Sequence, residues 1–323
     1  MKFKKDKIVF LDAGTVDYGD ISFEVLQRLG NFKAYRHTRP SEMPARIRNA
    51  RIVIANKCIF DRKLIRQFQP ESCICLTATG VNNVELEAAR RSGIAVTNVK
   101  GYSTETVVQT TFAFLLALAG NLVKYDQLVH RGTWSRSPFF TVGKYPVREV
   151  WGKTLGILGY GTIGKRVAAV GRALGMKILI SRIPGRTYPR AEQIQRKPFD
   201  RVIRRADFVS IHAPLSGFTR NLIGSDVLRR MKKGAFLINV ARGGIVDEKA
   251  LYRALRSGHL AGAATDVLSA EPPPRNHILM KAPNLLMSPH IAWASREARL
   301  RLIREAALNI QAFQAGKSRN RVV

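Results

Sequence analysis

The sequence has few cysteines: only Cys58, Cys73 and Cys75 among 323 residues. An odd number at this spacing offers neither the paired bridges of a small secreted scaffold nor the ligand spacing of a zinc site. Cys73 and Cys75 stand two apart in an apolar run, so they would share one face of a strand. We therefore expect buried thiols in a reducing compartment and no bound metal.

Long hydrophobic runs are also missing. The longest candidate, around residues 107–120, is interrupted by Gln109, Thr110 and Thr111, whereas a membrane span needs about 20 apolar residues. This stretch is typical of a buried core helix. The apolar run after the basic N-terminus ends at Asp12, which predicts that no cleavable signal is present. We expect a cytoplasmic protein with no membrane partner.

Acidic residues are scarce relative to basic ones. The chain has 23 Asp and Glu against 54 Lys and Arg, a formal net charge of +31. Such a charge attracts anionic partners, which include nucleic acids, anionic lipids and small anionic substrates. The sequence has no helix-turn-helix pattern, zinc motif or basic arm, and its basic residues are scattered. We therefore expect a small anionic substrate rather than a nucleic acid partner.

Short apolar runs alternate with helical stretches along the whole chain. The length and the 46% hydrophobic content predict two globular domains. In the first hundred residues the expected strands are 8–11, 52–55, 73–76 and 94–96. After Trp151 the expected strands are 154–158, 176–181, 208–211, 235–238, 261–267 and 285–287, with a final helix over about 295–315. This alternation predicts an α/β fold with two parallel sheets.

The first strand of the second block is followed by a glycine-rich loop, Gly159-Tyr160-Gly161-Thr162-Ile163-Gly164. A G-x-G-x-x-G between a strand and a helix is the context of a dinucleotide site. The first glycine permits the tight turn, the second lets the backbone approach a pyrophosphate, and the third lets helix and strand pack closely. The N-terminus of the helix supplies free N–H groups and a positive dipole end for the phosphates.

The residue after the next strand is basic. An acid about 20 residues beyond the loop normally holds the ribose hydroxyls of NAD, but the strand over 176–181 ends in Arg182 and no carboxylate follows before Glu192. An arginine suits the ribose phosphate of NADP, and Arg186 and Arg190 follow closely. NADP is therefore the predicted preference, with a generally basic surface as the alternative reason for these arginines.

Three later segments place polar residues just past predicted strands. They carry Asn239 and Arg242, then Asp266 and Glu271, then His290. Open α/β sheets bind ligands at this edge. Reduction of a ketone builds negative charge on its oxygen, which needs a positioned acid and a cation. Histidine can move a proton near neutral pH, a carboxylate can orient it, and arginine can bind a carboxylate. Each residue alone would be structural, but together they indicate a catalytic group.

Further segments complete a pattern that runs nearly end to end: residues 12–18 (Asp-Ala-Gly-Thr-Val-Asp-Tyr), 134–138 (Trp-Ser-Arg-Ser-Pro) and 290–295 (His-Ile-Ala-Trp-Ala-Ser). With them the chain resembles the D-isomer-specific 2-hydroxyacid dehydrogenase family, and in particular its glycerate dehydrogenase (hydroxypyruvate reductase) branch. The resemblance implies an oxidoreductase that reduces hydroxypyruvate or glyoxylate to the D-2-hydroxy acid with hydride from NAD(P)H.

The resemblance also implies roles for individual residues. Arg242 would bind the substrate's carboxylate and carbonyl oxygen, His290 would donate a proton to that oxygen, and Glu271 would hydrogen-bond the other ring nitrogen of His290. The implied substrate contacts are Ala78, Thr79, Gly80, Arg242 and His290. The implied contacts to NADP or NAD are Thr106, Gly159, Tyr160, Gly161, Thr162, Ile163, Gly164, Ser181, Arg182, His212, Ala213, Pro214, Thr219, Asn239, Val240, Ala241, Asp266, His290 and Ala292.

The expected layout is that of two Rossmann-like or flavodoxin-like domains. A cofactor domain over 102–289 would be inserted in a discontinuous substrate domain made of 1–101 and 290–323. The helix that begins at Tyr102 resembles the family's connecting helix, with Thr106 and Gln109 facing cofactor or substrate. Its apolar character also fits the family's dimer interface, so we expect a homodimer.

Several residues depart from the family pattern. Lys100 stands where a proline is expected, Val81 where the branch often has tyrosine, Thr110 where many relatives have histidine, and Arg182 in place of the ribose acid. None of these changes removes a catalytic group, but they leave the choice of substrate and cofactor open. Glu271 argues against the formate dehydrogenase relatives, which carry glutamine there.

Three alternatives remain at this point. Transcription corepressors share this fold and its dinucleotide site, and a strongly basic chain would suit DNA. A second alternative is a family member with weak catalysis, in which the motifs survive. The third keeps the enzyme class but replaces hydroxypyruvate or glyoxylate with a bulkier aryl 2-oxo acid.

Overall fold

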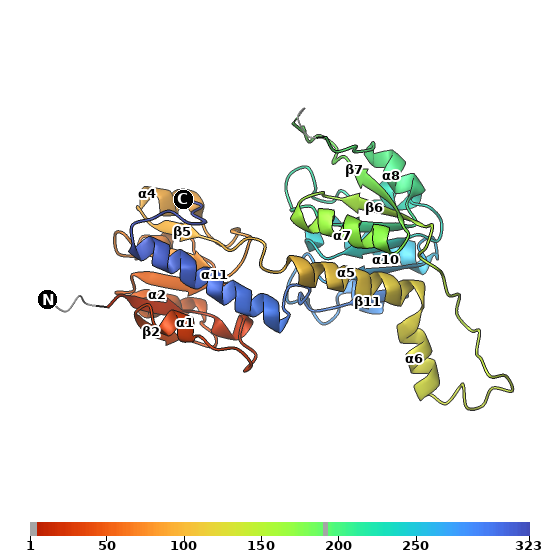
Figure 1. Cartoon of the computed structure of the whole chain (residues 1–323), viewed down its shortest axis with the longest axis horizontal. Coiled ribbons are helices and arrows are strands. Elements are labelled where there is room, and N and C mark those ends of the chain that lie inside the picture. Colours follow the sequence, from red (N-terminus) through yellow and green to blue (C-terminus); the bar gives the residue numbers. More distant parts are fainter. Residues whose placement is uncertain (1–4, 190–192) are drawn as a thin grey trace. The chain divides into compact units, whose positions relative to one another are not determined.

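A computed structural model of the protein describes residues 5–189 and 193–323. The chain divides into two compact units, the first made of 1–103 and 294–323 and the second of 104–293 (Figure 1). The predicted boundaries differ by a few residues, since they place residues 102–103 in the second unit and residues 290–293 with the C-terminal part of the first. The structure assigns residues 290–293 to the second because the carboxylate of Asp266 accepts hydrogen bonds from the N–H groups of Ile291 and Ala292.

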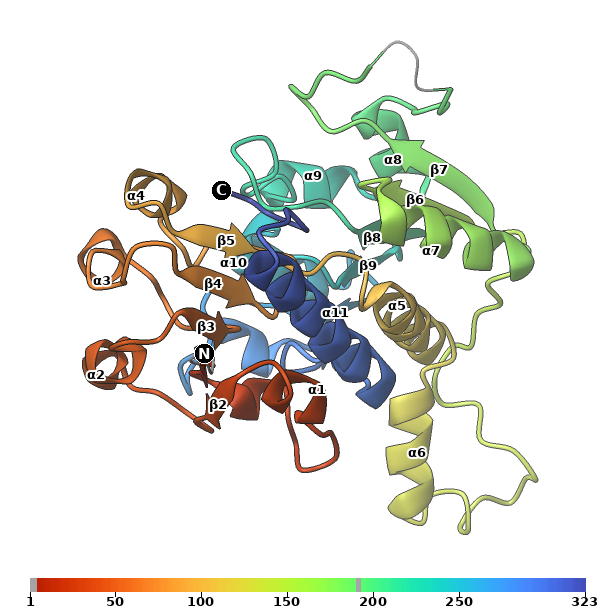
Figure 2. The same cartoon turned by 60° about the vertical axis from the view of Figure 1, so that its left-hand side comes forward.

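The first unit is built on a parallel five-stranded sheet in the order β2-β1-β3-β4-β5, which is the flavodoxin-like order. Its strands are β1 (Lys7–Phe10), β2 (Asn31–Ala34), β3 (Ile52–Ala55), β4 (Cys73–Leu76) and β5 (Ala95–Thr97). Its helices are α1 (Glu24–Gln27), α2 (Met43–Ile47), α3 (Arg62–Ile65), α4 (Leu86–Arg91) and α11 (Arg296–Gln314). Figure 2 shows α2, α3 and α4 on one face of the sheet and α1 and α11 on the other. Both faces are thus covered, so β3 and β4 are buried throughout.

The second unit contains a parallel six-stranded sheet in the order β11-β10-β9-β8-β6-β7. Its strands are β6 (Thr154–Leu158), β7 (Lys177–Ser181), β8 (Phe208–Ile211), β9 (Phe236–Asn239), β10 (Gly262–Thr265) and β11 (Leu285–Met287). One apolar layer lies under α5 (Thr104–Ala119) and α7 (Thr162–Ala173). The other lies under α8 (Phe199–Arg205), α9 (Ser225–Arg230) and α10 (Glu248–Arg256). The strand order reverses between β6 and β8, and ligands bind outside the carboxyl ends of strands at such a point.

An arm, residues 120–153, extends from the second unit after α5. Asn121 adopts a left-handed conformation (φ 49°), and the chain turns there into α6 (Leu122–His130). A long segment without helix or strand then returns to β6 (Figure 1). Within the described residues no single helix is long and apolar enough to cross a membrane, and α5 and α6 meet that test only as a pair bent by 62°.

The predicted fold class of two parallel-sheet α/β domains is confirmed. The cysteines are free, with Cys73 and Cys75 fully buried in β4 and Cys58 half-buried. One strand, β2, was not predicted.

Candidate functional site

The glycine-rich loop connects β6 to α7 as the sequence predicts. Gly159 has a φ of +96°, and a Cβ there would lie 2.5 Å from the backbone nitrogen of Ala213. A Cβ on Gly164 would lie 2.1 Å from the carbonyl oxygen of Gly159. By contrast, a Cβ on Gly161 would meet no described atom within 4 Å. The first and third glycines are therefore required by packing, and the second leaves open space at the start of α7.

This open space fits the pyrophosphate of a dinucleotide. Gly161 is the N-cap of α7, and the first turn of that helix holds no acidic residue. The unpaired N–H groups and the positive dipole end of the helix would therefore face an anion without a competing carboxylate. Tyr160 and Ile163 pack with the apolar layer under α5 and α7, which leaves the loop backbone for the ligand.

The end of β7 carries a basic loop. Ser181 is buried and donates its hydroxyl hydrogen to the carbonyl of Arg182. Arg182 is exposed, and its own N–H donates to the carbonyl of Lys197 at 2.9 Å. The guanidinium of Arg196 lies 4.2 Å from the centre of the Tyr188 ring. No aspartate or glutamate occurs in 182–189 or 193–198, and the predicted contributor Arg190 lies outside the described residues.

The end of β8 carries His212, whose side chain is neutral. Burial lowers the pKa of His212 to about 3. The Nε2 atom of His212 lies 2.8 Å from the hydroxyl of Ser210. The backbone N–H of His212 donates to the carbonyl of Leu158 beside the glycine-rich loop. Thr219 closes the loop that follows by donating its hydroxyl hydrogen to the carbonyl of Pro214 at 2.7 Å. Ala213 is also buried and packs against Gly159.

Arg242 stands on a turn that follows β9. The side chain of Asn239 closes this turn: its amide nitrogen donates to the carbonyl of Arg242 at 2.9 Å, and its oxygen accepts from the N–H of Ala241 at 3.1 Å. The guanidinium of Arg242 is exposed and donates to the carbonyl of Ala241. A Cβ on the next residue, Gly243, would lie 2.0 Å from the carbonyl carbon of Leu268. The turn is thus packed directly on the segment that follows β10.

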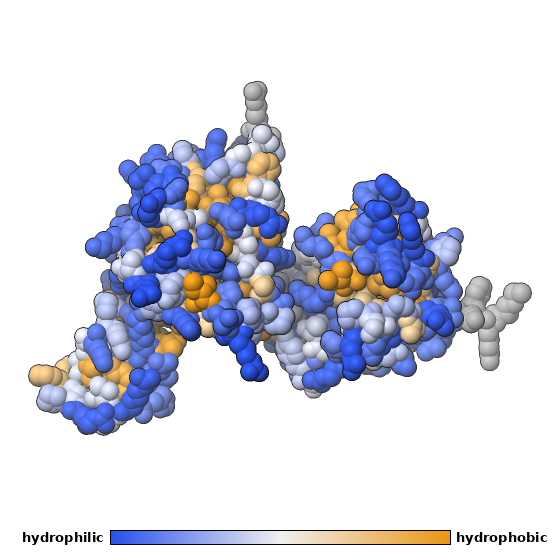
Figure 3. All heavy atoms as spheres, turned by 180° about the vertical axis from the view of Figure 1, so that it is seen from behind, coloured by the Kyte–Doolittle hydropathy of each residue, from blue (hydrophilic) through white to orange (hydrophobic). Residues whose placement is uncertain are grey.

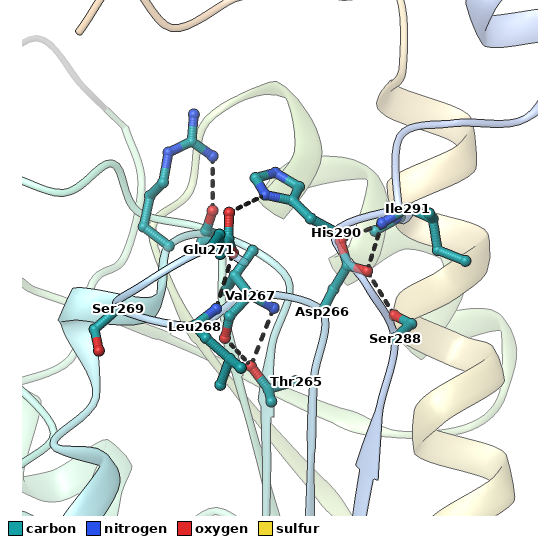
Figure 4. Close-up of polar contacts among 12 residues, drawn as sticks. Thr265, Asp266, Val267, Leu268, Ser269, Glu271, Ser288, His290 and Ile291 are labelled. Atoms are coloured by element: carbon teal, nitrogen blue, oxygen red, sulfur yellow. Dashed lines mark hydrogen bonds and ion pairs between the residues drawn. The ribbon is translucent and has the colours of Figure 1, made fainter. Parts of the chain in front are cut away.

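Asp266, just past β10, organises the segment that follows β11 (Figure 4). Its carboxylate accepts from the hydroxyl of Ser288 at 2.5 Å and from the N–H groups of Ile291 and Ala292. Its carbonyl accepts from the N–H of His290 at 2.8 Å. Burial raises the pKa of Asp266, although the hydrogen bonds that its carboxylate accepts lower this pKa. His290 is held in a left-handed conformation, with a φ of 56°.

His290 and Glu271 form a close pair. The Nδ1 atom of His290 lies 2.6 Å from Oε2 of Glu271 (Figure 4). The other carboxylate oxygen of Glu271 accepts from the N–H of Leu268 at 2.9 Å. The carboxylate orients the imidazole, and the two side chains remain 23% and 35% exposed. The arrangement can deliver a proton from Nε2.

The predicted substrate loop follows β4 in the first unit. Ala78 accepts from the N–H of Val99, and Thr79 donates its hydroxyl hydrogen to the carbonyl of Val99. Asn98 also donates its side-chain amide to the carbonyl of Thr79. Within 5–189 and 193–323, the N–H groups of residues 78–80 donate no hydrogen bond. The loop therefore presents consecutive free donors from a braced backbone.

The remaining predicted contacts to cofactor or substrate lie in the second unit, on α5 and just after β9 and β11. Thr106 is buried in the first turn of α5, whereas Gln109 is exposed. Val240 and Ala292 are buried together in the apolar layer under α5 and α7. Sequence reasoning did not select Ser288, the N–H of Leu268, or Glu248, which binds Ser269 beside the Glu271 segment. The only sequence signal was their place near motifs already chosen.

Known proteins match the chain over most of its length. Residues 112–292, more than half of the chain, match the family described as D-isomer specific 2-hydroxyacid dehydrogenase, NAD binding domain. The glycerate dehydrogenase of Methylorubrum extorquens is 37% identical over 317 residues, which cover 97% of this chain and 98% of that protein. The hydroxypyruvate reductase of Blautia hydrogenotrophica is 33% identical, with the same coverage of both chains. The crystal structure of the TT0316 protein from Thermus thermophilus superimposes with a TM-score of 0.87 at 32% identity, covering 98% of this chain and 100% of that one.

The chain therefore belongs to the D-isomer specific 2-hydroxyacid dehydrogenase family. It is an oxidoreductase whose second unit is a domain for a nicotinamide cofactor. The family and the enzyme class predicted from the sequence are confirmed.

Proposed function

We propose that the protein reduces a small 2-oxo acid, hydroxypyruvate or glyoxylate, to the D-2-hydroxy acid, with Arg242, Glu271 and His290 as its catalytic residues. The observation that carries this proposal is the 2.6 Å contact between His290 and Glu271. Glu271 follows β10 and His290 follows β11, while the turn of Arg242 follows β9, the other neighbour of β10 in the sheet. The names of the relatives, which include glycerate dehydrogenase, hydroxypyruvate reductase and glyoxylate reductase, support the substrate class.

Each side chain has a physical role in this reaction. The nicotinamide cofactor, when bound, supplies a hydride to the carbonyl carbon. Negative charge then develops on the carbonyl oxygen, and His290 donates the proton from Nε2 because its Nδ1 faces Glu271. The Glu271 carboxylate fixes the orientation of the imidazole through its contact with Nδ1. The Arg242 guanidinium binds the substrate carboxylate and the carbonyl oxygen through its planar fork.

The free N–H groups of residues 78–80 have the chemistry to donate hydrogen bonds to a substrate carboxylate. Three consecutive backbone donors suit an anion, and the hydrogen bonds of Thr79 and Asn98 brace the loop. We therefore assign them to substrate binding.

The test is the initial rate of cofactor oxidation by the wild-type protein with hydroxypyruvate, glyoxylate and an aryl 2-oxo acid. We expect turnover that depends on one of the two small acids. Faster turnover of the aryl acid would replace the substrate but keep the reaction. A protein that binds the cofactor and oxidises it with none of the three would be a binding protein on this fold, and the proposal would be wrong.

We further propose that NADP is the preferred cofactor, because Arg182 occupies the position after β7 in a loop whose described residues include no acid. Replacing Arg182 by Asp should lower the ratio of kcat/KM for NADPH to that for NADH by about tenfold or more, since a charged hydrogen bond to phosphate is lost. Steady-state kinetics with both cofactors measure this ratio. Arg201→Asp, an exposed change of equal charge on α8, should leave it unaltered. If Arg182→Asp leaves the ratio unchanged, Arg182 does not contribute to cofactor preference and is part of the generally basic surface.

A homodimer is the proposed oligomeric state. We place its interface on the arm and not on the helix predicted from Tyr102, because most apolar residues of α5 are buried in the core of its own unit. Phe139 and Phe140 on the arm are 74% and 90% exposed, and Trp134 is 52% exposed. Apolar residues gather on this arm in the space-filling view (Figure 3). Exposed apolar patches of this kind mark protein contacts. A second copy would cover them.

Replacing both Phe139 and Phe140 by Ser should shift the protein from dimer to monomer, because the replaced side chains would no longer gain from burial. Light scattering coupled to size-exclusion chromatography gives the mass directly. The matched control is Ile59→Ser, which removes a 70% exposed side chain from the first unit and should leave the mass unchanged. A wild-type protein that is monomeric at every concentration would refute the dimer.

A further inference from the structure

Glu248, the first residue of α10, binds a segment that is distant in sequence. An acid in the first turn of a helix ordinarily interacts with the dipole of its own helix, and here the neighbouring Asp247 already caps α10 by accepting from the N–H of Ala250. The Glu248 carboxylate instead accepts two hydrogen bonds from Ser269, at 2.7 Å from the N–H and 2.6 Å from the hydroxyl. Its side chain is only 14% exposed.

His277 also binds the carboxylate of Glu248. Its Nε2 lies 3.1 Å from Oε2 of Glu248, and its side chain is 11% exposed. Its Nδ1 accepts from the N–H of Leu279, so Nε2 carries the hydrogen and donates it to Glu248. Glu248 is therefore fixed between two partners, neither of which belongs to its own helix.

The segment around Ser269, which Glu248 holds, contacts Glu271 and the turn that carries Arg242. Leu268, which precedes Ser269, donates its N–H to Glu271, and Glu271 pairs with His290. On the opposite side, the backbone of Leu268 and Ser269 would be within 2.3 Å of a Cβ on Gly243, the neighbour of Arg242. A displacement of Ser269 would thus move the carboxylate that orients His290 and the turn that carries Arg242.

We propose that Glu248, clamped by His277, is a positioning residue for the reaction. It fixes the backbone at Ser269 and, through that backbone, sets the Glu271–His290 contact and the Arg242 turn. This assignment rests on the function proposed above for Arg242, Glu271 and His290. It adds two residues that touch neither substrate nor cofactor but on which the alignment of the reacting groups depends.

The kinetic test compares Glu248→Ala with Lys249→Ala, a change at the next, exposed residue of α10. Misplacement of reacting groups by about 1 Å costs about 10²-fold in rate. We expect Glu248→Ala to lower kcat with hydroxypyruvate by about tenfold or more, with KM for the cofactor unchanged, and Lys249→Ala to match the wild type. Ser269→Ala, which keeps the backbone donor, should show a smaller loss.

A second comparison separates positioning from stability. A residue that acts through Glu271 loses its effect once Glu271 is replaced, because the two changes are then non-additive. Adding Glu248→Ala to Glu271→Gln should therefore lower kcat by a smaller factor than Glu248→Ala does in the wild type, the remaining loss being the effect through the Arg242 turn. A full multiplicative loss in the double variant, or a lower unfolding midpoint with wild-type kcat at 25 °C, would reduce Glu248 to a structural residue and overturn the proposal.

A spectroscopic measurement reads the same contact without turnover, so it remains decisive if the proposed reaction is wrong. The ring-nitrogen resonances of His290, assigned by their absence in His290→Gln among the six histidines of the chain, report its bond to Glu271. We expect them to shift in Glu248→Ala and, should that variant not fold, in Ser269→Ala, but to stay unchanged in Lys249→Ala. Wild-type resonances in the folded Glu248 or Ser269 variant would contradict positioning, whatever substrate the enzyme uses.

Discussion

Replacing Arg242 by Ala is expected to lower kcat/KM for hydroxypyruvate by about 10²- to 10³-fold, the range measured when a donor to developing oxyanion charge is removed. The guanidinium is exposed and its only described hydrogen bond goes to the carbonyl of Ala241. Its loss should therefore leave the fold intact. Because the glycine-rich loop is a separate part of the second unit, affinity for NADPH should remain close to that of the wild type. Stopped-flow rates and fluorescence titration of NADPH measure the two quantities separately.

Two companion variants sharpen this result. Arg242→Lys keeps the positive charge but loses the planar fork, so its loss of rate should be intermediate. Arg256→Ala removes an exposed arginine from the last turn of α10 and should behave as the wild type. Undiminished turnover of hydroxypyruvate by Arg242→Ala would remove Arg242 from the catalytic group.

Gly243→Ala is expected to have the second large effect. The new Cβ would lie 2.0 Å from the carbonyl carbon and 2.2 Å from the carbonyl oxygen of Leu268. These are backbone atoms, so either the turn of Arg242 or the segment that carries Glu271 must shift. A displacement of this kind costs about 10²-fold in rate. We expect that loss in kcat, together with a lower unfolding midpoint, in steady-state kinetics and thermal denaturation.

The adjacent glycine provides a matched control. Among the described residues, the atom nearest to a Cβ on Gly244 would be a terminal carbon of the flexible Leu215 side chain at 3.4 Å, which is an ordinary contact distance. Gly244→Ala should therefore keep wild-type kcat within about twofold. Equal losses in Gly243→Ala and Gly244→Ala would mean that the packing of the Arg242 turn on Leu268 does not govern the rate.

The fold was predictable wherever burial leaves a clear pattern in the sequence. Strands β3 and β4 are buried on both faces and read as uninterrupted apolar runs. Strand β2 was missed because it lies at the edge of its sheet and three of its four residues are exposed. Its sequence, Asn-Phe-Lys-Ala, alternates over only four residues and has a single large apolar side chain, which is too short a signal to indicate a strand. The predicted core helix over 107–120 ends where α5 ends, whereas α6, which follows the left-handed Asn121, was not predicted.

The candidate site was predictable to the extent that side-chain chemistry defines it. Arg242, Glu271 and His290 are separated by up to 48 positions (290 − 242), yet each follows a strand of one parallel sheet. The supporting contacts were not predictable, since a backbone donor such as the N–H of Leu268 leaves no mark in the sequence. Glu248 was also hidden, because an acid at the start of a helix already has an ordinary explanation in the helix dipole.

The most direct test of hydride transfer to a 2-oxo acid uses NADPH that carries two deuterium atoms at C4 of the nicotinamide. The protein is incubated with this cofactor and hydroxypyruvate, or with glyoxylate if that acid is the faster substrate. The product is then analysed by mass spectrometry and, for hydroxypyruvate, by chiral chromatography. The predicted product of hydroxypyruvate is D-glycerate with one deuterium at C2, and that of glyoxylate is glycolate with one deuterium at C2. Cofactor oxidation without deuterium at C2, or glycerate of the L configuration, would contradict the proposed function.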